Sequence, residues 1–366
     1  MKKCKAKSLL KKSAKILVHP LIAIICGILV GAVVIFLAGE NPLDVYVQMF
    51  QKSFLNIYYL LQTLTRSVPI IACSLSVIIS WKAGYINLGT EGQMIAGGFV
   101  GTIVAIYMPG PTYLVMAAAF IAAMATGSIL SLFSAFIFDK FGVSIVISTL
   151  MMNYAINYIT NYFITFPLRD TGSSLAIQSK EIHAAMKLPR LVEGNTFNLG
   201  FIIAVLLVAA ITFIIFKTNF GYESKMTGLN PIFAQYGGIK KGRVMYSTMA
   251  LSGMLAAVAG LLEIFGVKYR FLEGMFTSTS YAWTGLMSGL ISSLNPIGAF
   301  FVSIFLSGMQ VGGTAIQRTT SIPLQVSTLI QATITLFVSV KITINFAKKN
   351  KFVSRGTNSA KKVGEE

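Results

Sequence analysis

Long apolar runs separated by short polar turns make up most of this sequence and limit what the chain can fold into. An α-helix needs about 20 apolar residues to cross a bilayer, and runs of that length recur along the chain. Of the 366 residues, 55% are hydrophobic and only 11% are charged, which is too apolar for a soluble domain of this length. We therefore expect an all-α membrane protein with several crossings.

Apolar runs and helix breakers predict about ten transmembrane helices, some of them broken. The expected spans are roughly 16–38, 57–80, 93–108, 112–138, 144–164, 199–216, 245–266, 280–293, 297–316 and 323–346. Nine or eleven crossings with one re-entrant segment remain open. The first run follows a basic N-terminus, as in a signal peptide, but it exceeds the usual ~7–15 apolar residues. We therefore keep it as a membrane helix.

Basic residues gather in three places and predict the orientation of the chain. Seven lysines lie in residues 1–15, five lysines or arginines in 217–244 and six in 347–366. Such clusters beside apolar spans mark the cytoplasmic side. Ten crossings then put both termini in the cytoplasm, as tails 1–15 and 347–366 around a membrane domain 16–346, and put loop 165–198 outside. The net charge of +18 is thus explained by basic clusters that flank membrane spans on the cytoplasmic side. We therefore expect the lipid bilayer, and no nucleic acid, as a partner.

No pattern of a catalytic or metal site occurs in the sequence. The chain has no Gly-Lys pair, so it lacks the phosphate-binding G-x-x-x-x-G-K-[ST] loop, and it has no H-E-x-x-H. Its three cysteines and two histidines show no metal-ligand spacing. We expect no catalytic residue, no metal and no cofactor bound by this chain, although an integral-membrane enzyme stays as an alternative.

Two glycine- and asparagine-containing stretches interrupt the apolar pattern. They are "KAGYINLGTEGQ" at 82–93 and "SGLISSLNPIG" at 288–298. Irregular backbone at membrane depth survives only where protein or water satisfies it, and such breaks often mark a transport path. The alternative is that both are ordinary cytoplasmic turns. The residues singled out in the first break are Asn87, Gly89, Glu91, Gly92 and Gln93.

The cytoplasmic loop 217–244 contains a local helix signal. Asn230 is a good N-cap and Pro231 suits the first helical position, while Gly237 and Gly238 stop the helix after residue 236. Phe233 and Tyr236 are apolar for an exposed loop. The loop is therefore either an exposed amphipathic turn or a docking element.

Several stretches resemble one family. "TGLNPIFAQYGGI" resembles the cytoplasmic loop of ABC-importer permeases in the branched-chain amino acid, ribose and nucleoside superfamily, and "YINLGTEGQMIAGG" is similar to their F-N-I-G-A-E-G-Q segment, typical of the nucleoside and simple-sugar branch. "LLEIFGVKYRFLEG", "GLMSGLISSLNPIGAFF" and "VGGTAIQRTTSIPLQVSTLIQ" look like that branch too. The resemblance runs from about Leu64 to Val338. The chain departs from the pattern in three places: Thr90 stands in place of alanine, Gln235-Tyr236-Gly237 stands in place of small residues, and the outer loop is divergent. These departures bear on substrate choice.

The resemblance implies a permease subunit of an importer in the bacterial plasma membrane, most similar to those for nucleosides. It implies a second homologous permease subunit, a cytoplasmic ABC ATPase that binds the ATP and Mg, and an extracellular lipid-anchored substrate-binding protein. The ATPase would dock on the residues Gly228, Asn230, Pro231, Ala234, Gly238 and Ile239. A simple-sugar permease of the ribose or galactose type and an ion-coupled secondary transporter are the alternatives.

An asparagine stripe crosses the expected span 144–164. In "NYAINYITNY", Asn153, Asn157 and Asn161 recur every fourth position, so they share one helix face, and Tyr154, Tyr158 and Tyr162 follow them ~100° around. The stripe is glue between helices, a translocation path with amides and stacking rings, or a tolerated feature near the outer surface. Asn153-Tyr154 and Asn161-Tyr162 match the family's recurring Asn-Tyr, which makes Asn157 the candidate specificity residue.

Further polar residues at membrane depth are candidates for the path. A carboxylate in hydrocarbon is costly and suggests a function, so Glu263 either lines a wet cavity or pairs with a buried donor. Glu91 would cap backbone N–H groups of the glycine-rich turn. Trp283 and Gln310 either line the path or pack in the core.

Overall fold

The computed structural model describes residues 29–37, 39–172 and 176–317, together with Gln325, Leu329 and Thr333. In these residues the regular structure is helical, apart from two isolated β-bridges. The chain divides into two compact units, one formed by residues 1–49 and 313–366 and the other by 50–312. In the first unit, Leu29–Leu37 is helical and α2 (Pro42–Phe50) begins. The second unit contains all the candidate site residues.

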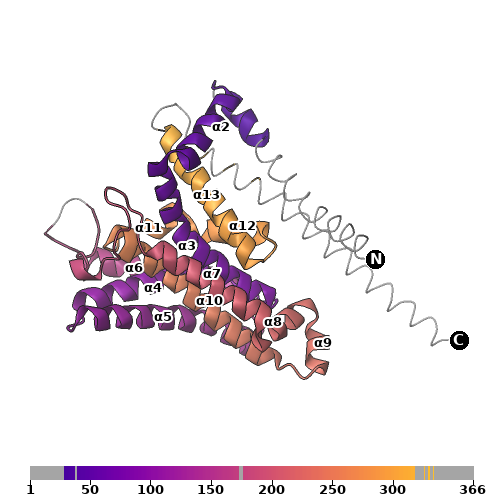
Figure 1. Ribbon diagram of the computed structural model, residues 1–366. Coiled ribbons are helices and arrows are strands. Elements are labelled where there is room, and N and C mark those ends of the chain that lie inside the picture. Colours follow the sequence, from indigo (N-terminus) through magenta and orange to yellow (C-terminus); the bar gives the residue numbers. More distant parts are fainter. Residues whose placement is uncertain are drawn as a thin grey trace. The chain divides into compact units, whose positions relative to one another are not determined.

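The larger unit is a bundle of helices of very different lengths (Figure 1). In chain order they are η1 (Gln51–Leu55), α3 (Ile57–Lys82), α4 (Thr90–Tyr107), α5 (Thr112–Phe141), α6 (Ile145–Thr165), η2 (Ala184–Met186), α7 (Gly200–Lys217), α8 (Asn219–Leu229), α9 (Pro231–Tyr236), α10 (Lys241–Glu263), η3 (Ile264–Lys268), α11 (Met275–Thr279), α12 (Tyr281–Ile291) and α13 (Pro296–Gln317), of which residues 313–317 belong to the first unit.

Five helices among the described residues are long and apolar enough to cross a membrane, or up to six if Leu29–Leu37 and Pro42–Leu55 form one bent span. The five are α3, α5, α7, the continuous stretch Lys241–Lys268 and α13. They coincide with the expected spans 57–80, 112–138, 199–216, 245–266 and 297–316. The expectation of an all-helical, multiply spanning membrane protein is therefore confirmed.

The expected count of ten crossings is not reached in this part of the chain. Helices α4 and α6 occupy the expected spans 93–108 and 144–164, with 18 and 21 residues. Helix α12, at the expected span 280–293, has only 11 residues and rises about 16 Å, roughly half of a bilayer's ~30 Å core. Residues 16–28, most of 323–346 and both basic tails lie outside the described residues, so the placement of the termini stays a prediction.

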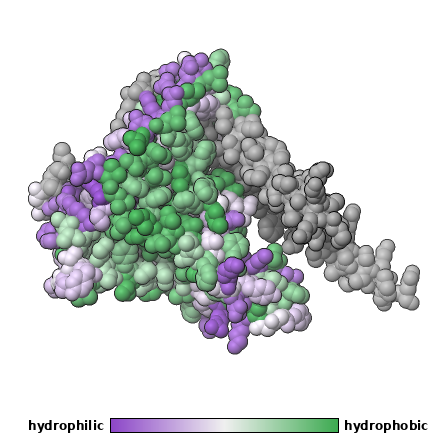
Figure 2. All heavy atoms as spheres, in the orientation of Figure 1, coloured by the Kyte–Doolittle hydropathy of each residue, from purple (hydrophilic) through white to green (hydrophobic). Residues whose placement is uncertain are grey.

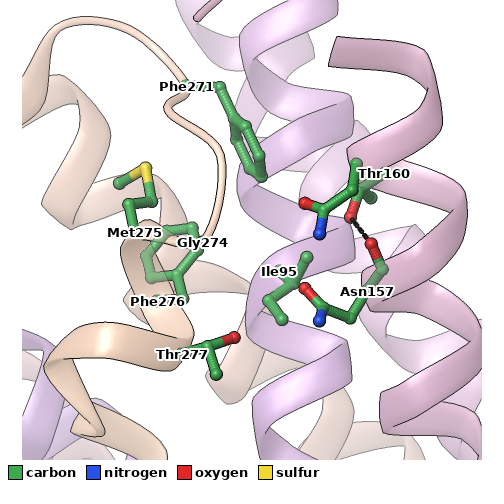
Figure 3. Close-up of a pocket in the computed structure, with 9 residues that line it drawn as sticks. Ile95, Asn157, Thr160, Phe271, Gly274, Met275, Phe276 and Thr277 are labelled. Atoms are coloured by element: carbon green, nitrogen blue, oxygen red, sulfur yellow. Dashed lines mark hydrogen bonds between the residues drawn. The ribbon is translucent and has the colours of Figure 1, made fainter. Parts of the chain in front are cut away.

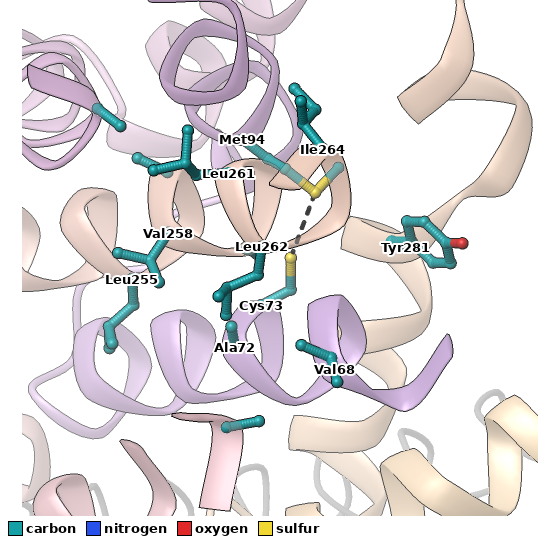
Figure 4. Close-up of a cluster of buried hydrophobic side chains, with 14 of the residues drawn as sticks. Val68, Ala72, Cys73, Met94, Leu255, Val258, Leu261, Leu262, Ile264 and Tyr281 are labelled. Carbon is teal, nitrogen blue, oxygen red and sulfur yellow. Dashed lines mark hydrogen bonds between the residues drawn. The ribbon is translucent and has the colours of Figure 1, made fainter. Parts of the chain in front are cut away.

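The core is built around α10, which packs against α3, α4 and α5. Figure 4 shows the α3–α10 contact, where Val68 and Ala72 of α3 face Leu255, Val258 and Leu262 of α10. Cys73 lies in this cluster with its Sγ 3.7 Å from Sδ of Met94. Apolar side chains of α3, α4 and α10 thus meet inside the bundle.

Small residues allow α5 and α10 to approach closely. Gly127 and Gly253 face each other, and a Cβ on either one would collide with the other's backbone. Beside them, Oγ of Ser131 donates to the backbone oxygen of Met249 at 2.6 Å. Close backbone contact and interhelical hydrogen bonds are typical of helices packed in a membrane.

The surface of the larger unit shows a broad hydrophobic zone (Figure 2). Hydrophilic residues gather on one side at loop 165–198, called the outer loop below after its expected placement, and over α8–α9 on the other, with the hydrophobic helices between them. This distribution suits a bilayer around the helices, with the two polar regions in water.

Candidate functional site

The asparagine stripe on α6 divides into residues with different surroundings. Asn153 is buried, with 7% of its surface exposed. Its Oδ1 accepts a hydrogen bond from the Gly92 N–H at 2.8 Å, and its Nδ2 donates to the Leu88 oxygen at 2.9 Å. Asn153 therefore holds the backbone on both sides of the start of α4.

Asn157 and Asn161 line a small pocket of about 10 Å³ between α6, α4 and the segment before and within α11. Figure 3 shows Asn157 and Thr160 facing Ile95 on one side and Phe271 to Thr277 on the other. The lining residues are Ile95, Asn157, Thr160, Asn161, Phe271, Gly274, Met275, Phe276 and Thr277. Oδ1 of Asn161 is buried and has no hydrogen-bond partner among the described residues. Since Asn157 lies 12 residues beyond the first residue of α6, the pocket is roughly 18 Å along that helix.

The far wall of the pocket belongs to an irregular segment that is bonded to the outer loop. Tyr269 and Ser280 have positive φ angles of 59° and 53°, which non-glycine residues adopt rarely. The Ser179 N–H donates to the Phe271 oxygen, and the Ile182 N–H donates to the Tyr269 oxygen, each at 2.9 Å. The outer loop and the pocket wall therefore form one hydrogen-bonded structure.

A partly exposed ion-pair cluster lies on the surface of this structure. Glu181 contacts Nζ of Lys187 at 2.6 Å and Arg270 at 2.9 Å. The hydrogen bond from Lys187 is the main reason that the pKa of the Glu181 carboxyl lies below its usual range. Because Arg270 precedes Phe271, the cluster ties the loop to the segment that forms the pocket wall.

The tyrosines of the stripe point away from this pocket. Tyr154, Tyr158 and Tyr162 are 61%, 73% and 59% exposed, and none of them is among the pocket residues. Their rings are open to lipid or to another protein chain.

The first break, residues 83–89, is braced by a buried polar network. Asn87 Nδ2 donates to Gln93 Oε1 at 3.0 Å and to Ser252 Oγ of α10 at 2.9 Å. Asn87 Oδ1 accepts from the Gly89 N–H at 2.8 Å. The turn is therefore fixed to α4 and α10 as well as to α6.

Glu91 and Trp283 were separate candidates, but the structure joins them. Trp283 Nε1 donates to Glu91 Oε2 at 2.9 Å, so α12 is tied to the first turn of α4. The expectation that Glu91 caps the turn differs from this contact, because its carboxylate reaches a side chain on a helix far along the sequence.

Glu263 pairs with a buried donor and is absent from the pocket. It is 3% exposed, and its Oε1 accepts from the Tyr281 hydroxyl at 3.2 Å. Arg66 of α3 and Lys268 add positive charge around it. The sequence analysis missed Arg66, although an arginine inside the apolar run 57–80 was a signal of the same kind as Glu263.

Gln310 also lies apart from the pocket. Its Nε2 donates to Thr284 Oγ1 at 3.0 Å, which joins α13 to α12. Phe271 and Phe276, which do line the pocket, were not singled out by the sequence, because only the chain's long-range folding brings them beside α6.

The second break, before α13, has unusual backbone. Ser293 and Leu294 both have positive φ, at 55° and 59°. Asn295 then caps α13 with its Oδ1, which accepts the N–H of Ile297 at 3.0 Å. This is a stop and restart of the helix, as the irregular stretch predicted.

The short helix expected in loop 217–244 is confirmed. α9 spans Pro231–Tyr236, and Asn230 Oδ1 accepts the N–H groups of Ile232 and Phe233. The exposed fractions of Ile232, Phe233 and Tyr236 are 64%, 59% and 89%, while Ala234 is buried. We call α8, Asn230 and α9 together the hook. The exposed Ile232, Phe233 and Tyr236 form its apolar surface.

The hook touches the membrane helices through a glycine. A Cβ on Gly228 would collide with the backbone oxygen of Lys82, at the end of α3. Gly84, at φ +90°, lies against the Gly228 Cα. The base of the hook is therefore in backbone contact with the first break.

Comparison with known proteins decides the family. Residues 59–339 match the family described as the branched-chain amino acid transport system permease component. The chain belongs to this family. It is an ABC-importer permease, the non-catalytic transmembrane subunit, and a multi-pass protein of the bacterial membrane, as the sequence predicted.

Curated relatives match nearly the whole permease. The guanosine ABC transporter permease protein NupP of Bacillus subtilis (strain 168) is 29% identical over 96% of this chain and 100% of its own length. The nucleoside ABC transporter permease protein NupB of Lactococcus lactis subsp. cremoris (strain MG1363) is 29% identical over 97% and 99%. The glucose ABC transporter permease protein TsgB13 of Haloferax volcanii is 27% identical over 90% and 88%.

Likeness to solved structures is weaker. PsaBC from Streptococcus pneumoniae aligns over 81% of this chain and 94% of that chain, with 11% identity and a TM-score of 0.45, which is too low to carry an argument. Membership of the family implies an ATPase and a substrate-binding protein as partners and no cofactor held by the permease itself.

Proposed function

We propose that this permease imports nucleosides. The observation that carries the proposal is the near full-length similarity to NupP and NupB, whose names state guanosine and nucleosides. The similarity to TsgB13, named for glucose, supports a sugar as the second candidate. On this proposal the path runs along α6, where Asn157 and Asn161 line the pocket.

The working transporter contains a second, homologous permease subunit. In support, two organisms each have a pair of permeases among the relatives of this chain. Bacillus subtilis has NupP and NupQ, and Lactococcus lactis has NupB and NupC. The exposed tyrosines of α6 give a face that this second subunit can cover.

Energy comes from a cytoplasmic ABC ATPase that binds ATP and Mg and docks on the apolar side of the hook. The exposed Ile232, Phe233 and Tyr236 support this, since a loop in water alone gains nothing from such side chains. A lipid-anchored binding protein delivers the nucleoside to the outer loop.

Uptake by the complete transporter tests the proposal. The complex, co-purified from native membranes and placed in proteoliposomes, should accumulate labelled uridine or adenosine when ATP is supplied. Unlabelled nucleosides should compete and ribose and glucose should not. Competition by glucose or ribose alone would establish the sugar candidate instead. Concentrative uptake by the lone chain, driven by a proton or sodium gradient, would make it a secondary transporter.

A further inference from the structure

We infer that the ends of α3 and α7 and the hook together bind the headgroup of one anionic phospholipid. The cations that hold its phosphate are Lys82, Lys217 and Lys225, and the exposed face of α7 receives its acyl chains. Because the ligand is a lipid, this inference does not depend on which substrate the permease carries.

The three lysines come from separate elements and gather at the ends of two candidate membrane spans. Lys82 and Lys217 are the last residues of α3 and α7, and these two helices pack against each other and against α8. Nζ of Lys82 lies 4.7 Å from the centre of the Phe216 ring. The ammonium group of Lys82 is therefore next to the residue that precedes Lys217.

Lys225 lies on the face of α8 that packs against these helix ends. A Cβ on Gly221 would collide with the Ile215 oxygen near the end of α7. A Cβ on Gly228 would collide with the Lys82 oxygen at the end of α3. Residues three and four positions apart share a helix face, so Lys225 lies between the two contacts. Its positive charge acts on Lys82, which shows that the two like charges are close together.

These like charges have no protein anion to balance them in the described part of the chain. The ion pairs found there are those of Glu181, in the outer loop. The acid of the hook, Glu223, is two positions from Lys225, and two positions turn about 200° around a helix. Glu223 therefore lies on the other side of α8. Close cations repel each other, and a phosphate group between them would replace this repulsion with attraction.

The outward face of α7 favours a lipid over a free anion. Its exposed large side chains include Ile202, Leu206, Phe213 and Phe216, whose spacings of four, seven and three keep them on one face of the helix. From Ile202 to Phe216 the helix rises about 21 Å, which exceeds the ~15 Å of one hydrocarbon leaflet. An acyl chain can thus lie along this face while its phosphate reaches the lysines, and basic sites between spans bind anionic headgroups in this way.

Lipid counting by native mass spectrometry tests the site. The complete transporter, purified in detergent, is titrated with phosphatidylglycerol, which is anionic, or with phosphatidylcholine of the same acyl chains, which has no net charge. Phosphatidylglycerol should bind more tightly, and inorganic phosphate, which has the charge without the chains, should not displace it. Lys225→Gln should raise the apparent Kd for phosphatidylglycerol about fivefold, the effect of losing one lysine beside an anionic headgroup.

The variant Lys140→Gln is the matched control, because it removes the same charge from the end of another candidate span, α5, where Asp139 precedes the lysine. It should bind phosphatidylglycerol as the wild type does. An equal loss of binding in Lys140→Gln would assign the effect to the general positive charge of this end of the helices and would overturn the inference.

Three other results would also overturn it. They are equal binding of the two lipids by the wild type, displacement of phosphatidylglycerol by inorganic phosphate, and normal lipid binding by a Lys225→Gln complex that has lost its ATPase. The last result would place Lys225 in the docking surface instead. The wild-type comparison needs no variant and so does not depend on the folding of Lys225→Gln.

Discussion

Asn153 and Asn157 are both asparagines on the same face of α6, but their surroundings give them different roles. Asn153 bonds the backbone at Leu88 and Gly92, whereas Asn157 faces a pocket. The periodicity of the sequence predicted the shared face, and the structure has it. The periodicity could not predict which amide has hydrogen-bond partners, because the partners of Asn153 come from a break some 60 residues earlier in the chain.

Replacement of these two residues should therefore have opposite effects. Asn153→Leu leaves a buried oxygen and a buried N–H unpaired, each costing about 1–3 kcal/mol, so the melting temperature of the detergent-purified transporter should fall by several degrees. Asn157→Leu should leave the melting temperature unchanged and reduce nucleoside uptake in vesicles. Normal uptake by Asn157→Leu at normal expression would remove Asn157 from the path.

Glu263 is a second case in which one residue's partner decides its role. Its carboxylate is buried against the Tyr281 hydroxyl, with Arg66 and Lys268 nearby. Glu263→Gln removes the charge from this buried hydrogen bond, and a hydrogen bond to a charged group is worth about 1.5–3 kcal/mol. We expect the protein to be degraded in cells, as measured by its abundance in membranes. Full abundance with abolished uptake would instead show a direct role in the path.

At the scale of elements, local chemistry made the short helix of the hook predictable. The structure that the outer loop forms with the pocket wall could not be predicted, because it depends on long-range hydrogen bonds. Asn230, Pro231 and the glycines after Tyr236 define α9 within nine residues, and its bounds follow from them. The hydrogen bonds between residues 177–182 and 269–273 join segments about 90 residues apart. No pattern within either segment indicates the other.

This outer structure should loosen in acid. The pKa of Glu181 is lowered by its bond from Lys187, so the ion pair stabilises the loop above the ordinary pKa of ~4.3 and loses that effect as the pH falls through the lowered value. Exposed pairs contribute at most ~1 kcal/mol. Hydrogen exchange, corrected for its intrinsic rate, should therefore show protection of the Ile182 amide falling by about two- to fivefold.

The variant Glu181→Gln is the control for this acid effect. It should show the lower protection already at neutral pH and no further change in acid. An equal acid response in Glu181→Gln would assign the loosening to another group.

At the scale of the whole larger unit, the hook, the first break and α6 form one chain of contacts. Gly228 abuts Lys82 and Gly84, the break that follows is held by Asn153, and Asn157 is one turn further along α6. If the ATPase docks on the hook as proposed, its movement therefore has a route of packed contacts to the pocket. The resemblance predicted the docking residues, but the contact behind Gly228 depends on how α8 packs under α3, which no local pattern shows.

Gly228→Ala tests this route. The added Cβ would meet backbone at Lys82, which cannot move aside as a side chain does, so α8 must shift from α3 at a cost of about 1–3 kcal/mol. The apolar surface of α9 is unchanged, so the ATPase should still co-purify and its basal hydrolysis should stay within twofold. Nucleoside uptake per ATP hydrolysed should fall by about tenfold.

Gly242→Ala, with nothing within 4 Å of its added Cβ, is the matched control and should transport as the wild type does. Coupling that is unchanged in Gly228→Ala would show that force reaches the pocket by another contact. Loss of the ATPase from the Gly228→Ala complex would mean that the glycine serves docking, because a shift of α8 that carries α9 with it displaces the apolar surface from its partner. The two results separate transmission from attachment, since only the first leaves hydrolysis running without transport.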